Sequence, residues 1–174
     1  MNSDDLSRRI RLLEDRAELR ELADRYCLAI DDSDWDALLG MFAEDAGMAG
    51  ATGSHEVVGV LRSVRSGYGR TIHTALAQVL DFADDDHASG VVPGRAELAI
   101  AGQTVVCAMR YLDDYVRVGG RWRFQRRNVR FGYALPWADM AGSMTAELPV
   151  RWPGAQPAPA DDQRPGAARG ASRA

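Results

Sequence analysis

The chain has 174 residues, of which 46% are hydrophobic, and its formal net charge at pH 7 is −4. This length and apolar content predict one independently folding domain. The net negative charge argues against nucleic acid or an anionic membrane surface as a partner. The chain contains arginine but no lysine, which excludes Schiff-base chemistry and a phosphate-binding loop.

The opening residues are charged and contain no apolar segment, so we expect no signal peptide. No apolar run reaches the ~18 residues of a membrane-spanning helix, and a cytoplasmic location is therefore expected. Cys27 and Cys107 each lie in an apolar, periodic segment. This placement favours buried free thiols over a disulfide or a metal site.

Residues 4 to 31 have the pattern of one long amphipathic helix without Pro or Gly. We expect its first turns to reach past the domain and to pack on a neighbour. Two apolar stripes follow one another along it: Leu6, Ile10, Leu13 and Ala17, then Leu19, Leu22, Ala23, Tyr26 and Ile30.

Asp31 ends this second stripe, where a carboxylate is unfavourable because the helix macrodipole places partial negative charge at the C-terminus. Two interpretations follow. Either Asp32-Ser33-Asp34 simply caps the next helix, with Ser33 or Asp32 as the capping residue, or one of the acids at this helix end points into the protein for chemistry. The next helix is expected over residues 34 to 43.

Residues 44 to 53 are acidic and then rich in small residues, which indicates a loop with a short strand over 47 to 51. Ser54-His55-Glu56 predicts the start of a third helix. Gly67 predicts its end, since glycine allows the left-handed conformation that closes a helix.

From residue 71 the apolar period changes from about 3.6 to 2, which predicts strands. We expect strands over 71–82, 87–100, 104–118 and 121–133, with tight turns between them. Pro93-Gly94 predicts a bulge or bend, because proline cannot donate to the ladder. Three helices followed by an antiparallel sheet make an α+β fold.

The C-terminal region divides into two parts. Residues 134 to 152 are irregular and moderately apolar, and we expect them across a pocket mouth or in a subunit contact. From Pro153 no apolar residue is larger than alanine, so the chain cannot bury enough surface to offset its ordering entropy. We predict a domain over 1–152 and a disordered tail over 153–174.

His73 alternates onto one face of its predicted strand with Thr71 and Ala75. A sheet with helices on one side leaves a concave pocket into which this imidazole can point. From its position alone, His73 is either a base or a hydrogen-bonded structural histidine. His55 and His87 are expected in solvent.

The last strand is crowded with arginine. Period 2 puts Arg123, Gln125, Arg127, Val129 and Phe131 on one face, and Trp122, Phe124, Arg126, Asn128 and Arg130 on the other. Neither face is uniformly apolar, so most of these guanidinium groups are expected to reach water. One in a pocket could stabilise a leaving hydroxide or an enolate.

Sequence motifs for cofactors are absent. The three histidines show no His-x-x-x-His spacing and the cysteines form no ligand pair, so we expect no metal. The sequence contains no Gly-x-Gly-x-x-Gly, no Walker motif and no Gly-x-Ser-x-Gly elbow. We therefore expect no cofactor.

Several segments together carry a family resemblance. Residues 25–31, 34–38 and 41–46, together with Thr71-Ile72-His73, 111–115 and 119–124, resemble the SnoaL-like branch of the nuclear-transport-factor-2-like superfamily. The resemblance covers roughly residues 6 to 135. It implies a cone-shaped α+β barrel in which three N-terminal helices pack on a curved antiparallel sheet. This fold hosts dehydratases, isomerases, cyclases, epoxide hydrolases and non-catalytic binding domains.

Within this superfamily the sequence is most similar to members that have an Asp-His dyad. The resemblance implies Asp31 and His73 as the dyad, Tyr26 as a hydrogen-bond donor and Arg127 as a further catalytic residue, with Arg130 as its rival. The aspartate would fix the tautomer of the imidazole and stabilise the imidazolium, while the other ring nitrogen accepts a proton.

The reaction that this dyad implies is proton abstraction followed by loss of a β-leaving group. We therefore expect a dehydratase-type lyase without a cofactor. An isomerase or cyclase in the same pocket is one alternative, and a non-catalytic ligand-binding domain is the other. A homodimer or homotrimer is expected by analogy.

The expected substrate is a small, largely apolar molecule such as a polycyclic steroid, terpenoid or polyketide. The residues expected to contact it are Trp35, Phe42, Leu61, Met109, Tyr111, Val129 and Phe131.

Overall fold

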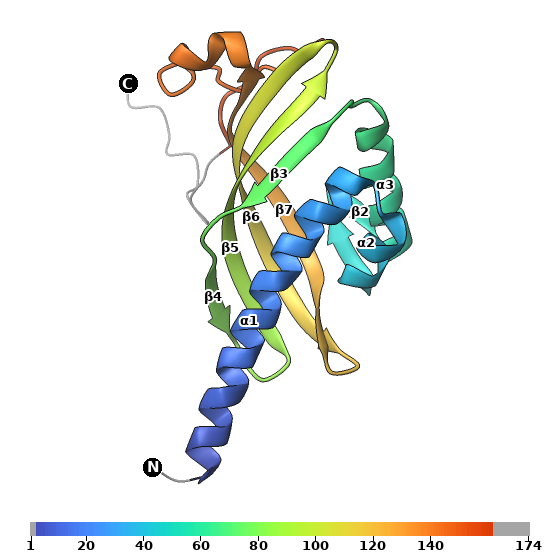
Figure 1. Cartoon of the computed structure of the whole chain (residues 1–174), viewed down its shortest axis with the longest axis vertical. Helices are drawn as coiled ribbons and strands as arrows, with labels where there is room; N and C mark the ends of the chain where they lie inside the picture. The colour runs from blue at the N-terminus through green and yellow to red at the C-terminus, as the bar shows by residue number, and fades with distance from the viewer. Residues whose placement is uncertain (1–2, 162–174) are drawn as a thin grey trace, which may run out of the picture.

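Residues 3–161 are described by the computed structural model, in which helices pack against a strongly curved seven-stranded sheet (Figure 1). The helices are α1 (Ser3–Asp32), α2 (Trp35–Met41) and α3 (Ser54–Ser66), with a short 3-10 helix, η1 (Trp137–Gly142). The strands are β1 (Phe42–Met48), β2 (Ala51–Thr52), β3 (Thr71–Ala75), β4 (Val79–Phe82), β5 (His87–Ile100), β6 (Gln103–Val118) and β7 (Arg121–Pro136).

The sheet order is β2-β1-β7-β6-β5-β3, and β4 pairs with β5. Helices packed against a curved sheet confirm the predicted α+β fold, although β1 and β2 come before α3 in the chain. The predicted antiparallel sheet needs one correction, because β1 pairs in parallel with β7. The sequence did not predict β1 at its full length. The exposed pair Glu44 and Asp45 falls where the β1–β7 register shifts, and this interrupts the period-2 pattern.

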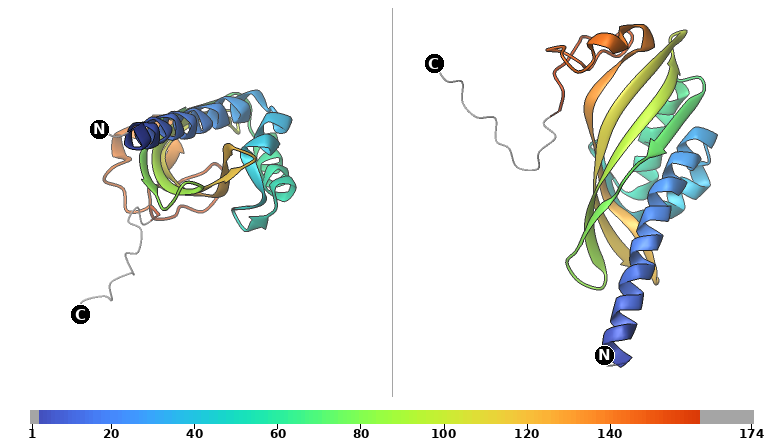
Figure 2. Two further views of the ribbon diagram at one scale, coloured as in Figure 1. Left: turned by 90° about the horizontal axis from the view of Figure 1, so that it is seen from below. Right: turned by 60° about the vertical axis from the view of Figure 1, so that its left-hand side comes forward.

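Helix α1 runs along the concave side of the sheet, and its N-terminal turns extend beyond it (Figures 1 and 2). Burial therefore begins only halfway along, and the predicted first stripe stays largely in solvent, with Leu13 68% exposed. The second stripe is buried in the core, at Leu19, Leu22, Ala23, Tyr26 and Ile30.

The predicted strand over 71–82 is two strands, because the chain leaves the sheet at residues 76–78. Both β3 and β4 pair with β5, on either side of Pro93. Of the bulge or bend predicted at Pro93, the bulge is wrong, since the β5–β6 register is regular throughout. Proline is tolerated here because Pro93 faces the gap between β3 and β4, where no ladder bond needs its missing N–H. Its carbonyl, on the same side, accepts the Leu76 N–H at 2.9 Å.

Gly94 lies in β5 at a position where a side chain would not fit. A Cβ atom at this position would lie 2.9 Å from Cε2 of Tyr111, on the neighbouring strand. The absent side chain therefore makes room for the Tyr111 ring on the concave face.

Two irregularities in β7 change which side chains share a face. Tyr115 pairs with Phe124 and Asp114 with Arg126, so Gln125 is an additional residue in β7. Such a bulge shifts the alternation by one position. Arg127, Val129 and Phe131 share a face as predicted, but the predicted grouping of these residues with Arg123 and Gln125 is wrong. Phe124 and Arg127 instead both lie on the concave face, opposite Tyr115 and Asp113. Gly132 is a second additional residue.

The C-terminal segment is held against β7 by backbone hydrogen bonds. Val150 and Ala158 donate to each other's carbonyls at 3.0 and 2.8 Å, and the Asp161 N–H donates to the Phe131 carbonyl at 2.9 Å. The predicted start of a disordered tail at residue 153 is thus too early. The remainder of that predicted tail, 162–174, lies outside the described residues.

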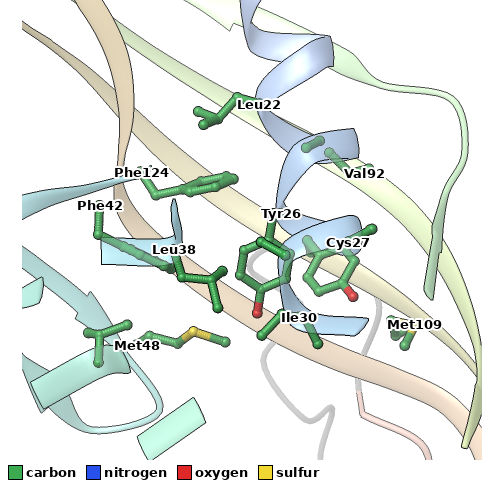
Figure 3. Close-up of a cluster of buried hydrophobic side chains, with 14 of the residues drawn as sticks. Leu22, Tyr26, Cys27, Ile30, Leu38, Phe42, Met48, Val92, Met109 and Phe124 are labelled. Carbon is green, nitrogen blue, oxygen red and sulfur yellow. The ribbon is translucent and has the colours of Figure 1, made fainter. Parts of the chain in front are cut away.

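Part of the core lies where the C-terminal half of α1 meets α2, β1 and β7 (Figure 3). Cys27 and Cys107 are both buried and free, which confirms the prediction from the sequence. Among the described residues, no helix has both the length and the hydropathy needed to cross a bilayer.

Candidate active site

A cavity of about 540 Å³ opens between the end of α1, α3 and the concave face of β6 and β7. Its lining is mainly apolar and aromatic, with a few polar side chains. Five of the predicted contacts lie in the lining: Leu61, Met109, Tyr111, Val129 and Phe131. Tyr26 and His73 line it as well.

Two predicted contacts lie elsewhere. Phe42 is buried in the core, where its ring packs edge-on against Tyr26 with the centroids 6.2 Å apart. Trp35 lies on α2, under the Arg62 guanidinium at 5.3 Å. Phe42 begins β1 and Trp35 begins α2, and both lie in or against the core rather than in the cavity lining.

Asp31 and His73 form a close pair at one end of the cavity. The His73 Nδ1 atom is 2.6 Å from Asp31 Oδ1, and the two side chains are 14% and 17% exposed. A carboxylate oxygen only accepts hydrogen bonds, so Nδ1 is the donor. In the neutral ring, Nε2 then has no proton and can accept one.

The last turn of α1 places Asp31 directly beside β3. Its Oδ1 also accepts a hydrogen bond from the Thr71 hydroxyl at 2.6 Å, and its Oδ2 accepts one from the His73 backbone N–H at 2.7 Å. All three donors come from one strand, so they fix both the position and the orientation of the carboxylate. These bonds account for an acid at a position that the helix dipole disfavours.

The cap of α2 is a different residue. Asp34 Oδ1 accepts the Ala37 N–H at 3.0 Å, so Asp34 is the N-cap rather than Ser33 or Asp32. Asp31 takes no part in this cap. The two interpretations of the acids at the helix end therefore hold for different residues, since Asp34 caps α2 and the Asp31 carboxylate points into the protein.

Tyr26 and Tyr111 bring two hydroxyl groups to the cavity wall. Burial raises the pKa of Tyr26 to about 12, although the nearby Arg127 cation opposes this shift. Burial also raises the pKa of Tyr111 well above its usual value. Both side chains therefore keep their protons at neutral pH and can donate hydrogen bonds.

Arg127 lies beneath these tyrosines rather than in the cavity lining. Its side chain is 1% exposed, and it forms a double hydrogen bond with Asp113, with Nε–Oδ1 at 2.9 Å and Nη2–Oδ2 at 3.1 Å. The guanidinium carbon stacks 4.2 Å from the Tyr26 ring centroid and 4.1 Å from that of Tyr111. Arg130, its predicted rival, does line the cavity.

The buried pair has further partners, and burial raises the pKa of Asp113 while the Arg127 charge opposes that shift. Burial disfavours the charged guanidinium, but the adjacent Asp113 carboxylate holds the pKa of Arg127 above its usual value. The Tyr115 hydroxyl donates to Asp113 at 2.8 Å and accepts a hydrogen bond from Gln78 at 3.0 Å. A fixed positive charge thus lies below the cavity floor.

Sequence reasoning missed several lining residues, among them Arg65, Tyr68 and Trp152. Arg65 and Tyr68 lie around the end of α3, where helical periodicity stops. Trp152 belongs to the C-terminal segment, where its ring packs edge-on against Phe131 at 5.2 Å. Within residues 3–161, no group of three or more potential ligand side chains could hold a metal ion.

Comparison with known families shows to which family this chain belongs. Residues 11–128 match the SnoaL-like domain. The chain belongs to the SnoaL-like family. No curated protein matches it. The cone-shaped fold described above is therefore that of a SnoaL-like protein.

Solved structures share this SnoaL-like fold. A scytalone dehydratase-like protein from Novosphingobium aromaticivorans is 21% identical, with a TM-score of 0.68 over 73% of this chain and 90% of that one. A hexachlorocyclohexane dehydrochlorinase from Novosphingobium barchaimii is 23% identical, with a TM-score of 0.67 over 74% and 94%. An NTF2-like protein with a cystatin-like fold from N. aromaticivorans is 26% identical, with a TM-score of 0.59 over 74% and 88%.

Proposed function

We propose that this SnoaL-like protein is a cofactor-independent lyase, a dehydratase that uses His73 as its general base and Asp31 to orient it. One observation carries the proposal. The His73 ring lines the cavity while its Nδ1 is 2.6 Å from the Asp31 carboxylate. An imidazole held in this way has one defined tautomer and a free nitrogen, and a base in position contributes about 10²- to 10⁴-fold to a rate.

The reaction begins when Nε2 of His73 removes a proton from a carbon next to an activating group. The electron pair of the broken C–H bond forms a new carbon–carbon double bond, and the β-hydroxyl leaves with its bonding pair. The proton taken by His73 is available to this hydroxide, which departs as water. Asp31 stabilises the imidazolium in between, as the acid of a hydrolase triad does.

Tyr26 is proposed as the donor to the oxyanion that develops in this step. Its hydroxyl keeps a proton because burial raises its pKa to about 12. Arg127 is proposed to act through Tyr26 and Tyr111, since its guanidinium lies against both rings and not in the cavity lining. A fixed cation near developing negative charge stabilises it without reorganisation.

The proposed substrate is a compact, apolar, polycyclic molecule of the steroid, terpenoid or polyketide type. A volume of about 540 Å³ falls within the usual range for small-molecule sites, about 300–1,000 Å³. Apolar and aromatic side chains form most of the lining, among them Leu61, Met109 and Phe131. The names of two structural neighbours, a dehydratase-like protein and a dehydrochlorinase, denote eliminations and agree with this chemistry.

Isomerisation in the same cavity is the second candidate. The lining includes two tyrosine hydroxyls, from Tyr26 and Tyr111. Such donors stabilise an enolate whether or not a group then leaves. If the substrate has no β-leaving group, His73 returns its proton to another carbon instead.

The test is a panel of hydroxylated polycyclic compounds incubated with the wild type, His73→Ala and His55→Ala. His55 is exposed at the start of α3 and serves as the matched control. Thermal shift reports binding, and mass spectrometry detects the loss of one water. We expect dehydration by the wild type and His55→Ala, and binding without dehydration by His73→Ala. Equal product from all three proteins would contradict the proposed base.

A further inference from the structure

Arg65 is the cavity residue with the most extensive backbone contacts. It lies in the last turn of α3, and its guanidinium donates to four carbonyl oxygens. These are Ile30 at 3.4 Å, Asp31 at 3.3 Å, Tyr68 at 3.1 Å and Gly69 at 2.8 Å. The guanidinium therefore uses its hydrogen bonds on the backbone and is not available to bind a ligand.

The four carbonyl groups belong to two segments that are far apart in the sequence. Two of them end α1, at and next to Asp31, and the other two belong to the loop that leads into β3. That strand carries His73 two residues after its start. One guanidinium thus joins the segment that supplies the acid to the segment that supplies the base.

The charge of Arg65 matches what the end of α1 lacks. The last turn of α1 contains no basic residue, although Asp31 and Asp32 add two acids to the partial negative charge of the helix C-terminus. The last four carbonyl groups of a helix have no partner within it. From a neighbouring helix, Arg65 supplies the missing cation and donates to two of these carbonyl groups, of which the Ile30 carbonyl also accepts the Ser33 N–H at 3.3 Å.

We propose that Arg65 is a positioning residue that sets the hydrogen bond between Asp31 and His73. This inference rests on the proposed function, because the dyad matters only if His73 acts as a base. Five N–H groups in a rigid plane can satisfy four carbonyl groups at once, whereas a lysine ammonium is a point charge on a flexible chain. Removing Arg65 frees the end of α1 to shift against β3.

The first test needs no substrate. Protein labelled with ¹⁵N at histidine is studied by NMR, with His73→Ala identifying the His73 signals. The ring ¹⁵N shifts report which nitrogen carries the proton. We expect a single Nδ1–H tautomer in the wild type, a mixture of tautomers in Arg65→Met, and an intermediate result in Arg65→Lys.

Arg62→Met is the matched control, since Arg62 lies one turn earlier on α3 and stacks on Trp35 instead. It should keep the wild-type tautomer. A wild-type tautomer in Arg65→Met, or the same mixture in both methionine variants, would overturn the inference. Arg65→Lys retains the cation and provides the measurement if Arg65→Met does not fold.

The second test uses any substrate found for the wild type. Arg65→Met should lose about 10- to 100-fold in kcat, because a small displacement of a reacting group is costly, while KM changes little. Equal kcat in Arg65→Met and Arg62→Met contradicts the inference. If the NMR result holds but no compound is dehydrated, the proposed function fails while the role of Arg65 in ordering the dyad stands.

Discussion

Asp31 and His73 lie 42 positions apart in the chain, yet a 2.6 Å hydrogen bond joins their side chains. Two further hydrogen bonds from β3 hold the same carboxylate. The contact therefore does more than join α1 to β3. It makes one imidazole nitrogen a hydrogen-bond donor and leaves the other able to accept a proton.

The first prediction concerns Asp31→Asn. The amide retains the shape of the carboxylate but loses its charge, so the imidazolium is no longer stabilised and its tautomer is no longer fixed. We expect kcat to fall by about 10²- to 10⁴-fold with little change in KM, by analogy with the acid of a hydrolase triad. Steady-state kinetics on a substrate found for the wild type measures this.

Asp34→Ala is the control for this variant. It removes the α2 cap, which should lower the free energy of unfolding by about 1 kcal/mol, and leave kcat unchanged. Urea denaturation measures the stability effect. A similar loss of kcat in Asp34→Ala would mean that Asp31 acts only through the local structure of the helix end.

The second prediction concerns Tyr26 at high pH. Its pKa is 10.0 in the unfolded chain and about 12 in the folded protein. Because the folded pKa is higher, the stability from this group is complete below pH 10 and is lost as the pH rises toward 12. Tyr26→Phe should therefore show a shallower fall in the free energy of unfolding over this interval, measured by denaturation at several pH values.

The same variant tests the proposed oxyanion donor. The Phe ring retains the packing of Tyr26 against Phe42 and Phe124 but has no hydroxyl. We expect a lower kcat at neutral pH with unchanged ligand-induced thermal shift. Unchanged turnover would assign the donor role to Tyr111 instead.

The third prediction concerns the buried pair of Arg127 and Asp113. Arg127→Met leaves a buried carboxylate without its partner, which costs about 3–5 kcal/mol of stability. The double variant Arg127→Met with Asp113→Leu removes both charges and should recover much of this loss. Denaturant unfolding of the single and double variants measures the difference. A double variant as unstable as the single one would show that the loss comes from packing and not from the unpaired charge.

The fourth prediction concerns Gly94. In Gly94→Ala the new Cβ atom would lie 2.9 Å from the Tyr111 ring, so the ring or the strand must move. We expect a loss of about 1–3 kcal/mol in stability and a displaced cavity wall.

Gly59→Ala is the control, because a Cβ atom at this position in α3 meets nothing within 4 Å. It should stabilise the protein by about 0.5–1 kcal/mol through the helix propensity of alanine. Thermal unfolding of both variants tests the pair. Equal melting temperatures for Gly94→Ala and the wild type would show that Tyr111 moves without cost.

Much of the candidate site could be predicted from local pattern. The apolar stripe of α1 ends at Asp31, and alternation along β3 puts His73 on the same face as Thr71. The burial pattern of both elements agrees with these two predictions. These two signals are short-range, and each depends on a single regular element. The family resemblance then supplied the link between the two elements, which periodicity alone does not give.

The errors arise where regular alternation fails. The additional residue Gln125 moves Arg127 to the face of Phe124, and no composition signal marks that bulge. Arg65 was missed because its role depends on carbonyl groups from two distant segments, which have no signature in side-chain sequence. Pro93 suggested a bulge, but its effect depends on the gap between β3 and β4.

Trp152 reaches the cavity from the C-terminal segment, beyond residue 128 where the SnoaL-like match ends. The proposed acid and base thus lie within the part of the chain that matches the family, whereas Trp152 adds to one wall of the cavity from a stretch outside that match. Exchange of this single indole would therefore change the shape of the cavity while the Asp31–His73 contact stays as it is.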